Sequence, residues 1–308
     1  MTVSKSITVL RTVQQVRQWR LQCILNRESV GLVPTMGALH AGHCSLVNES
    51  LQENDRTVVS IFVNPSQFAP HEDLDAYPRT VERDLELLER AFNQKSVDAV
   101  FIPKISEMYP SGITLDVNQQ RGAFVTVHGC SEQLEGVTRP QFFRGVATVV
   151  TKLLNIVTPT RAYFGQKDAQ QCVVIKNLVK DLIMDTEIRV LPTLRESNGL
   201  AMSSRNEYLS QEMKDRSSII FKALSTGQAY YTQRGTKVAA KDIINLVKPI
   251  ITSDPEFELE YLAISHPETL DDLEYVEPGV GAIISTAVKV PRESGDGKAR
   301  LIDNVILN

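Results

Sequence analysis

The chain contains a near-continuous apolar run at residues 57–63 (TVVSIFV), which ends at an Asn-Pro pair. A strand that is apolar at successive positions is typical of a parallel sheet covered by helices on both faces. Shorter runs that indicate further strands occur at residues 30–34, 97–102, 161–164 and 187–191. This pattern restricts the fold, because parallel strands need long crossover connections, which are usually helices.

The segments between these runs have apolar residues at helical spacing. Residues 140–157 are the clearest case, because Phe143, Val146 and Val150 recur on one face. The spacing predicts helices at residues 12–26, 43–53, 79–92, 140–157 and 168–182. We therefore predict an α/β fold, a Rossmann-like doubly wound parallel sheet.

From about residue 193 the predicted strands and helices no longer alternate, and the helices and the strands each form a group. Two predicted helices come first, at residues 209–232 and 236–252. Three predicted strands follow, at residues 257–264, 281–290 and 299–307, with a turn at 293–298 between the last two. We predict two domains, a larger one at residues 1–192 and a smaller α+β domain at residues 193–308.

Composition argues against several classes of protein. The 308 residues carry a net charge of −4. The chain therefore lacks the excess of basic residues that would predict a nucleic-acid partner. The four cysteines are widely spaced and lack a CxxC pair, which indicates buried or free thiols rather than a zinc site. Nothing approaches the ~20 apolar residues of a membrane span, and the N-terminus lacks a signal-peptide core. Arg11, Arg17 and Arg20 would suit mitochondrial targeting, but we prefer a structural first helix in a cytoplasmic protein.

Two histidines lie between the predicted strand at residues 30–34 and the predicted helix at residues 43–53. They belong to the segment PTMGALHAGH at residues 34–43. A helix N-terminus offers backbone N–H groups and the positive end of the helix dipole, which favour a phosphate. Gly42 allows the backbone to approach a ligand, and His40 and His43 can donate to phosphate oxygens as charge develops. The HxGH pattern resembles the signature of the nucleotidylyltransferase superfamily. The alternative is a turn with two ordinary surface histidines.

Ligands of doubly wound sheets bind beyond the carboxyl ends of the strands. Asn64 and Gln67 follow the long apolar run, and a glutamine there can present an amide to a carboxylate and a hydroxyl together. Lys167, in the sequence GQKD, can lie against phosphate oxygens as a point charge, whereas Asp168 is a good helix N-cap. Gln171 lies one turn further along the same helix. Taken alone, Gln67 also fits a solvated turn and Lys167 an ordinary exposed lysine.

A glycine-led polar loop, GLAMSSRN at residues 199–206, lies near the start of the second predicted domain. The hydroxyls of Ser203 and Ser204 and the guanidinium of Arg205 suit a β/γ-phosphate or the leaving pyrophosphate. The alternative is a hairpin tip with a helix cap. Paired with HxGH, the loop resembles the KMSKS-like element of the same superfamily, with an arginine where a lysine is usual.

Five motifs occur in a fitting order and spacing: PTMGALHAGH, SIFVNPSQF, DLDAYPR, FGQKD and GLAMSSRN, which begin at residues 34, 60, 73, 164 and 199. Together they resemble the pantothenate synthetase (pantoate–β-alanine ligase) family over roughly residues 10–210, and more weakly beyond. The resemblance implies a first domain that binds nucleotide and pantoate, in a homodimer. Because a reactive intermediate must be kept from water, we expect the C-terminal domain to act as a lid.

The resemblance also implies roles for individual residues. His43 matches the family's catalytic residue, and from the chemistry of phosphate charge we expect His40 and Lys167 to be catalytic as well. ATP contacts are implied for Met36, Gly37, His40, Gly42, His43, Gly165, Gln166, Lys167, Asp168, Leu194, Met202, Ser203, Ser204 and Arg205. Gln67, Gln171 and Asn64 would bind pantoate, and Gln67 would also lie near β-alanine.

Three departures from the family pattern limit this transfer. Asp84 matches one member of an acidic pair associated with magnesium, but Arg83 takes the other position, so Mg²⁺ is expected to arrive bound to ATP. Gln166 stands where glutamate is usual. Residues 111–138 form a longer stretch than in the bacterial pattern, so no roles are transferred to them.

The implied activity is the ATP-dependent condensation of (R)-pantoate with β-alanine to give pantothenate, AMP and pyrophosphate, a step of coenzyme A biosynthesis. A pantoyl-adenylate intermediate would supply the leaving group that an ionised carboxylate lacks. Two alternatives stay open at this point. A nucleotidylyltransferase that retains the nucleotide in its product would use the same HxGH loop without needing two glutamines for a small polyol acid. The other alternative is a non-catalytic ATP-binding regulator on this fold.

Overall fold

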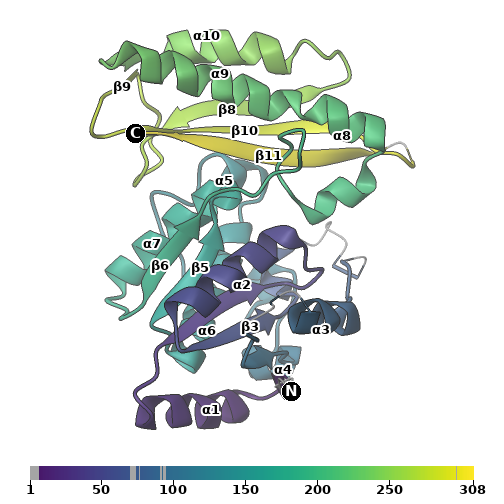
Figure 1. The fold of residues 1–308 in the computed structure, drawn as a ribbon, viewed down its shortest axis with the longest axis vertical. Helices are drawn as coiled ribbons and strands as arrows, with labels where there is room; N and C mark the ends of the chain where they lie inside the picture. Colours follow the sequence, from purple (N-terminus) through teal and green to yellow (C-terminus); the bar gives the residue numbers. More distant parts are fainter. Residues whose placement is uncertain (1–6, 70–73, 76, 91, 93–94, 296) are drawn as a thin grey trace. The chain divides into compact units, whose positions relative to one another are not determined.

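A computed structural model describes residues 7–69, 74–75, 77–90, 92, 95–295 and 297–308 (Figure 1). The chain divides into two compact units. The first comprises Met1–Gly165 with Val174–Leu191, and the second comprises Gln166–Val173 with Pro192–Asn308. Four features of the sequence analysis lie wholly or partly outside the described residues: the N-terminal residues 1–6, the motif at 73–79, the end of the helix at 79–92 and the turn at 293–298.

The first unit is built on a six-stranded parallel sheet with the order β1-β4-β3-β2-β5-β6. Its strands are β1 (Thr8–Leu10), β2 (Val30–Thr35), β3 (Arg56–Ile61), β4 (Ala99–Phe101), β5 (Arg161–Gly165) and β6 (Glu187–Leu191). β2 pairs with β3 on one side and with β5 on the other. The strand order reverses at this point, so the topological switch point lies beside the carboxyl end of β2.

The helices that belong wholly or partly to this unit are α1 (Val13–Leu25), α2 (Ala41–Glu53), α3 (Val81–Arg90), α4 (Ile105–Met108), α5 (Glu135–Thr138), α6 (Phe142–Val157) and α7 (Ala169–Asp181). The buried side chains of Leu46, Val47 and Leu51 on α2 belong to one apolar cluster with Val33 and Val59 of the sheet. Burial of these residues fixes α2 against β2, β3 and β5. Within the described part of the chain, no helix is long and apolar enough to cross a membrane.

Helix α6 lies against the short 3₁₀ helix η1 (Pro65–Gln67), which follows β3. The approach requires a glycine, because a Cβ at Gly145 would lie 2.3 Å from the carbonyl oxygen of Ser66. Any larger side chain would therefore push α6 away from the segment that carries Gln67.

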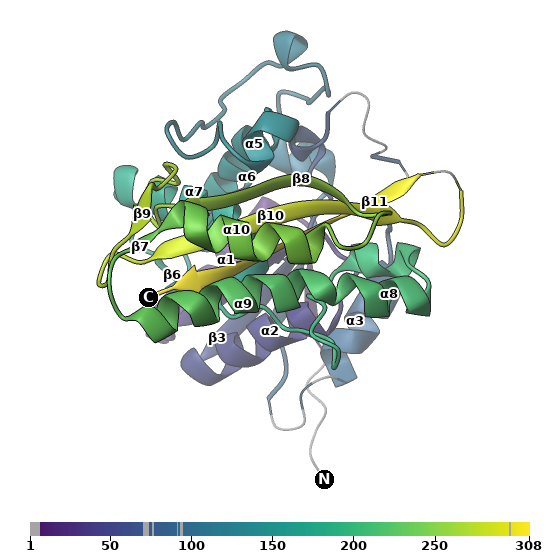
Figure 2. The same ribbon diagram turned by 90° about the horizontal axis from the view of Figure 1, so that it is seen from above.

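The second unit contains an antiparallel sheet with the order β11-β10-β8, a strand pair and three further helices (Figure 2). These elements are α8 (Gln211–Ser217), α9 (Ile219–Arg234), β7 (Val238–Ala239), α10 (Ala240–Ile251), β8 (Glu258–Ser265), β9 (Tyr275–Val276), β10 (Ala282–Pro291) and β11 (Lys298–Leu307). Helices α9 and α10 pack on each other and on the sheet, and buried Leu224, Ile243 and Ile284 join them in one core.

The predicted fold class is confirmed, but several elements differ from the prediction. The helix predicted at 209–232 is two helices, because Ser218 ends α8, and its Oγ donates to the Asp215 carbonyl at 2.6 Å. The helix predicted at 236–252 begins only at Ala240, because the two residues before it pair with β9. Strand β1 and helices α4 and α5 are absent from the prediction, since three or four residues are too few to show a period.

Candidate active site

The two histidines occupy the first turn of α2, directly beyond the carboxyl end of β2. His40 is the N-cap residue, and its Nδ1 accepts the N–H of Gly42 at 3.1 Å. His43 accepts the His40 N–H through its own Nδ1 at 3.4 Å, which completes a capping box made of two imidazoles. The ring centroids lie 4.1 Å apart. The start of the helix therefore fixes both rings side by side.

The capping box also selects the tautomer of the two rings. A ring nitrogen that accepts a backbone N–H carries no proton, so a neutral imidazole in this arrangement is protonated at Nε2. Both His40 and His43 accept through Nδ1. Each ring therefore has an Nε2–H donor. The usual signal of a capping box is Ser or Thr followed by Glu or Gln, so the sequence analysis missed this structural role.

Asp84 holds the turn that precedes the helix. Its side chain is only 1% exposed, and its carboxylate oxygens accept the N–H groups of Ala38 at 3.0 Å and Leu39 at 2.8 Å. The hydroxyl of Thr80 donates to the same carboxylate at 3.2 Å. The turn is therefore tied to the start of α3 by one buried carboxylate.

Several of the backbone N–H groups on which the predicted phosphate site rests are bonded within the chain. Besides the two groups bound by Asp84, the N–H of Gly37 donates to the Thr35 hydroxyl at 3.2 Å. The N–H groups of His40 and Gly42 are used in the capping box. The loop contains its own acceptors, so these backbone donors bond within the chain.

The residues present do not fit the metal role implied for Asp84. Both of its oxygens face backbone N–H groups at hydrogen-bonding distance. Among the described residues, no cluster of three or more His, Cys, Asp or Glu side chains is arranged to hold a metal ion. Mg²⁺ in proteins keeps several water ligands, whereas the Asp84 carboxylate is buried and accepts three hydrogen bonds within the chain.

A buried polar network follows β3, the strand next to β2. Asn64, which is 1% exposed, donates through Nδ2 to Gln67 Oε1 at 2.9 Å and to the Gly145 carbonyl at 3.2 Å. Its Oδ1 accepts the hydroxyls of Tyr109 at 2.6 Å and Ser66 at 3.1 Å. Burial raises the pKa of the Tyr109 phenol, which keeps it a donor. The network turns the Nε2 end of the Gln67 amide away from Asn64.

In the second unit, the side chain of Asn304 on β11 forms hydrogen bonds with the segment that contains Lys167. Asn304 is 2% exposed and donates through Nδ2 to the carbonyls of Gln166 at 2.8 Å and Lys167 at 3.0 Å. Its Oδ1 accepts Gln166 Nε2 at 3.2 Å. Asp168 ends the short helix η3 (Gln166–Asp168) and directly precedes α7, and Gln171 lies half-buried in the first turn of α7.

The polar loop is a hairpin tip followed by a capped helix, as the structural alternative predicted. The Met202 N–H donates to the Leu194 carbonyl at 2.9 Å, which joins two residues of the predicted ATP set. Gly199, with φ of +96°, lies in the turn. Ser203 caps η4 (Ser204–Tyr208) by accepting the Arg205 N–H at 3.2 Å.

The hairpin is anchored by a buried ion pair that the sequence analysis missed. Arg195 donates to both carboxylate oxygens of Asp303 at 2.6 and 2.9 Å and to the Gly199 carbonyl at 3.1 Å. Its guanidinium lies 3.5 Å from the ring centroid of Phe221. The available signal was the adjacent polar pair Asp303-Asn304 within the otherwise apolar run at residues 301–307.

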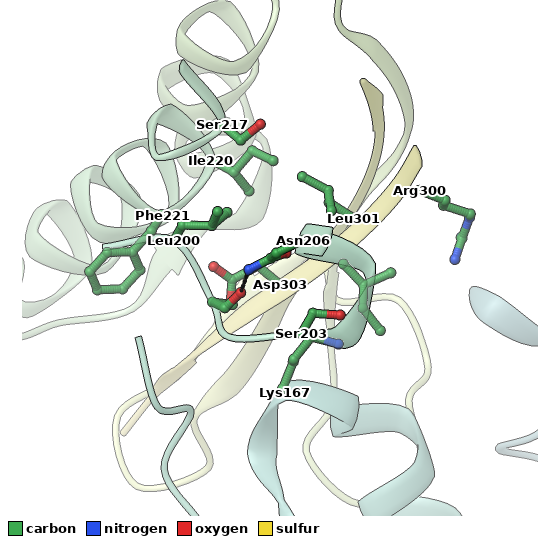
Figure 3. Close-up of a pocket in the computed structure, with 12 residues that line it drawn as sticks. Lys167, Leu200, Ser203, Asn206, Ser217, Ile220, Phe221, Arg300, Leu301 and Asp303 are labelled. Atoms are coloured by element: carbon green, nitrogen blue, oxygen red, sulfur yellow. Dashed lines mark hydrogen bonds between the residues drawn. The ribbon is translucent and has the colours of Figure 1, made fainter. Parts of the chain in front are cut away.

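A small cavity lies behind this hairpin, and Lys167 and Ser203 both line it (Figure 3). Asn206, Ser217 and Asp303 contribute further polar atoms. Its volume of about 10 Å³ is far below the ~300–1,000 Å³ of ligand pockets. The cavity is therefore too small to be a ligand site. It does show that Lys167 and Ser203, two residues of the predicted ATP set, lie close to each other.

Each unit, taken by itself, assembles part of the predicted site. The first unit places Met36, Gly37, His40, Gly42 and His43 beyond β2, and Asn64 with Gln67 beyond the adjacent β3. The second unit joins Gln166 and Lys167 to Asn304, Leu194 to Met202, and Lys167 to Ser203 around one cavity. Gly165 ends β5 in the first unit, and the side chain of Arg205 is exposed.

The fold and the HxGH loop at residues 40–43 together define a class of protein. A doubly wound sheet with HxGH at its switch point has the architecture expected of the nucleotidylyltransferase superfamily. The sequence model described as pantoate–β-alanine ligase matches residues 8–306. The chain therefore belongs to the pantoate–β-alanine ligase family, as the sequence motifs predicted.

Individual relatives agree over nearly the whole chain. The pantoate–β-alanine ligase of Saccharomyces cerevisiae is 46% identical, over 97% of this chain and 99% of its own. The crystal structure of pantothenate synthetase from Thermus thermophilus has a TM-score of 0.83 at 40% identity, over 97% of this chain and 99% of its own. A Francisella tularensis pantoate–β-alanine ligase, solved with "Beta-gamma ATP" and β-alanine, has a TM-score of 0.72 at 32% identity, over 97% of both chains.

Proposed function

We propose that this chain joins pantoate to β-alanine at the expense of ATP, which becomes AMP and pyrophosphate. The observation that carries the proposal is the two-histidine capping box at the switch point, in a chain that belongs to this ligase family. The ligands of the Francisella tularensis structure support ATP and β-alanine as two of the substrates.

In the first step, a carboxylate oxygen of pantoate attacks the α-phosphorus of ATP. A bond forms between oxygen and phosphorus, and the bond to the departing pyrophosphate breaks. Nε2–H groups of His40 and His43 would stabilise the charge that develops on the phosphate oxygens. This role suits the tautomer that the capping box selects. Lys167, Ser203, Ser204 and Arg205 are proposed to hold the remaining phosphate charge, alongside the other ATP contacts named above.

In the second step, the neutral amine of β-alanine attacks the acyl carbon of pantoyl adenylate. The new amide bond forms, AMP leaves, and the ammonium nitrogen releases a proton. Gln67 and Gln171 are proposed to hold pantoate, with Gln67 also near β-alanine, and Asn64, whose amide is fully bonded within the chain, is proposed to act through Gln67. Asn64 supports this placement by orienting the Gln67 amide, since it occupies the Oε1 end.

Magnesium is proposed to arrive with ATP rather than in a protein cage. The buried carboxylate of Asp84, which accepts three hydrogen bonds within the chain, supports this view. The homodimer, the cytoplasmic location and the lid role of residues 193–308 also remain proposals. Sedimentation of the purified protein would test the first of these, since a single species at monomer mass would contradict it.

The decisive experiment is pyrophosphate exchange. Labelled pyrophosphate should enter ATP when pantoate is present and β-alanine is absent, because the first step is reversible and needs no amine. Adding β-alanine should then yield AMP and pantothenate. Exchange that strictly requires β-alanine would contradict the two-step scheme. A product that retains the nucleotide would indicate a nucleotidylyltransferase, and tight ATP binding without turnover would indicate a regulator.

A further inference from the structure

The turn at residues 37–39 adopts a backbone conformation that needs support. Ala38 has a φ of +50°, in the left-handed region that non-glycine residues adopt at a cost, and Gly37 has a φ of +87°. The next residue is His40, the N-cap of α2. The position of the capping box therefore depends on a turn whose backbone conformation is unfavourable at Ala38.

Asp84 supplies that support from a different element. Its two oxygens bind the N–H groups of Ala38 and Leu39, which are the two residues before His40. The fit is close, because a Cβ at Gly37 would lie 3.1 Å from Asp84 Oδ2. Hydrogen bonds to a buried carboxylate are stronger than bonds between neutral groups.

We infer that Asp84 is a positioning residue for adenylation: its carboxylate holds the 37–39 turn and thereby aims the Nε2–H groups of His40 and His43 at the phosphates of ATP, and it does not ligate magnesium. The inference rests on the proposed function. A carboxylate is required, because asparagine has one acceptor end and one donor end. An asparagine amide would therefore face one of the two backbone N–H groups with another N–H.

The test compares Asp84→Asn with Thr80→Val, which removes only the side-chain donor to the same carboxylate. For Asp84→Asn we expect kcat of pantoate-dependent exchange to fall ~10–100-fold, the usual cost of losing an outer-shell partner. KM for pantoate and the Mg²⁺ concentration at half-maximal rate should stay close to those of the unmodified protein. Thr80→Val should keep the normal rate, because both backbone bonds remain.

Rescue provides a second readout. Glycine adopts positive φ readily, so Ala38→Gly should restore at least part of the kcat lost in Asp84→Asn. Nitrogen-15 spectra of labelled histidine should report Nε2–H tautomers for His40 and His43 in the unmodified protein, and a changed pattern in Asp84→Asn. This readout does not require turnover.

Each outcome decides between explanations. A kcat within about twofold of normal, with unchanged histidine spectra, would overturn the positioning role. Recovery of the full rate at high Mg²⁺ would make Asp84 a metal ligand and overturn it as well. Loss of cooperative melting in Asp84→Asn, with and without Ala38→Gly, would show that the carboxylate serves the fold of the unit instead. Failure of the unmodified protein to exchange would refute the proposed function and not this assignment.

Discussion

The loop before α2 and the hairpin before η4 are both proposed to contact ATP, yet they are built differently. In the first, the imidazoles of His40 and His43 are both the proposed contacts and the cap of the helix. In the second, Arg195 and Asp303 hold the hairpin, while the proposed contacts are other residues, Ser203 to Arg205. Structure and chemistry therefore share side chains throughout the first loop, whereas in the second a separate ion pair holds the hairpin, although Ser203 also caps η4.

The largest effect should come from the framework of the hairpin. Asp303→Ala leaves the guanidinium of Arg195 half-buried without its partner, which typically costs ~3–5 kcal/mol. Urea unfolding followed by circular dichroism would measure this cost. Glu277→Ala, which breaks the exposed pair with Lys237, is the matched control and should cost at most ~1 kcal/mol. Equal stabilities for the two variants would remove Asp303 from the framework.

His43→Ala should reveal the double role of the first loop. Loss of one preorganised donor lowers a rate by ~10²–10³-fold, so pyrophosphate exchange should fall by this factor while pantoate binding changes little. Loss of a capping partner should also destabilise the protein by ~0.5–2 kcal/mol. His128→Ala, at a side chain 84% exposed, is the control. A slow but fully stable His43→Ala protein would break the comparison between the two loops.

The segment after β3 offers an intermediate case, because Asn64 orients an amide that Gln67 is proposed to present to pantoate. Gln67→Ala should reduce kcat/KM for pantoate by the equivalent of ~1–3 kcal/mol, the cost of leaving a buried polar group without its hydrogen-bond partner. Steady-state exchange kinetics would measure this as a change in kcat/KM for pantoate. Gln171→Ala should behave alike, and exposed Gln18→Ala should have no effect. A loss of ATP affinity at constant pantoate affinity would move Gln67 to the nucleotide.

Cys44 should show the smallest effect. Burial raises the pKa of its thiol, so less of it is the reactive thiolate at neutral pH than in an exposed cysteine. Adenylation already supplies a leaving group, so Cys44→Ala should keep its activity within about tenfold, the equivalent of ~1.4 kcal/mol. Trapping of a pantoyl thioester, together with complete inactivity of a folded Cys44→Ala protein, would require a covalent mechanism.

Sequence patterns were sufficient for the elements whose signals are local and long. The run at 57–63 and the stripe on α6 each show their period over several residues, so β3 and α6 lie where they were predicted. The five motifs likewise identified the family. Helix α9 was merged with α8, because nothing in the periodicity around Ser218 signals an interruption.

The supports of the site were beyond the reach of such patterns. The family resemblance associated Asp84 with magnesium, and its bonds to Ala38 and Leu39, which lie more than forty positions away in the chain, could not be read from the sequence. Asn304 lies still farther from Lys167, at a separation of 137 positions in the chain. Contacts of this kind depend on how the elements pack, and a single sequence does not record that packing.

The second unit is not one continuous stretch of chain, which limits how this protein can be divided or recombined. A fragment cut at residue 192 would lack Gln166–Val173, and Asn304 would lose the carbonyl and amide groups that it binds on Gln166 and Lys167. The two parts are therefore not interchangeable modules. A chimera of two relatives should keep its C-terminal portion intact only if residues 166–173 come from the parent that supplies β11.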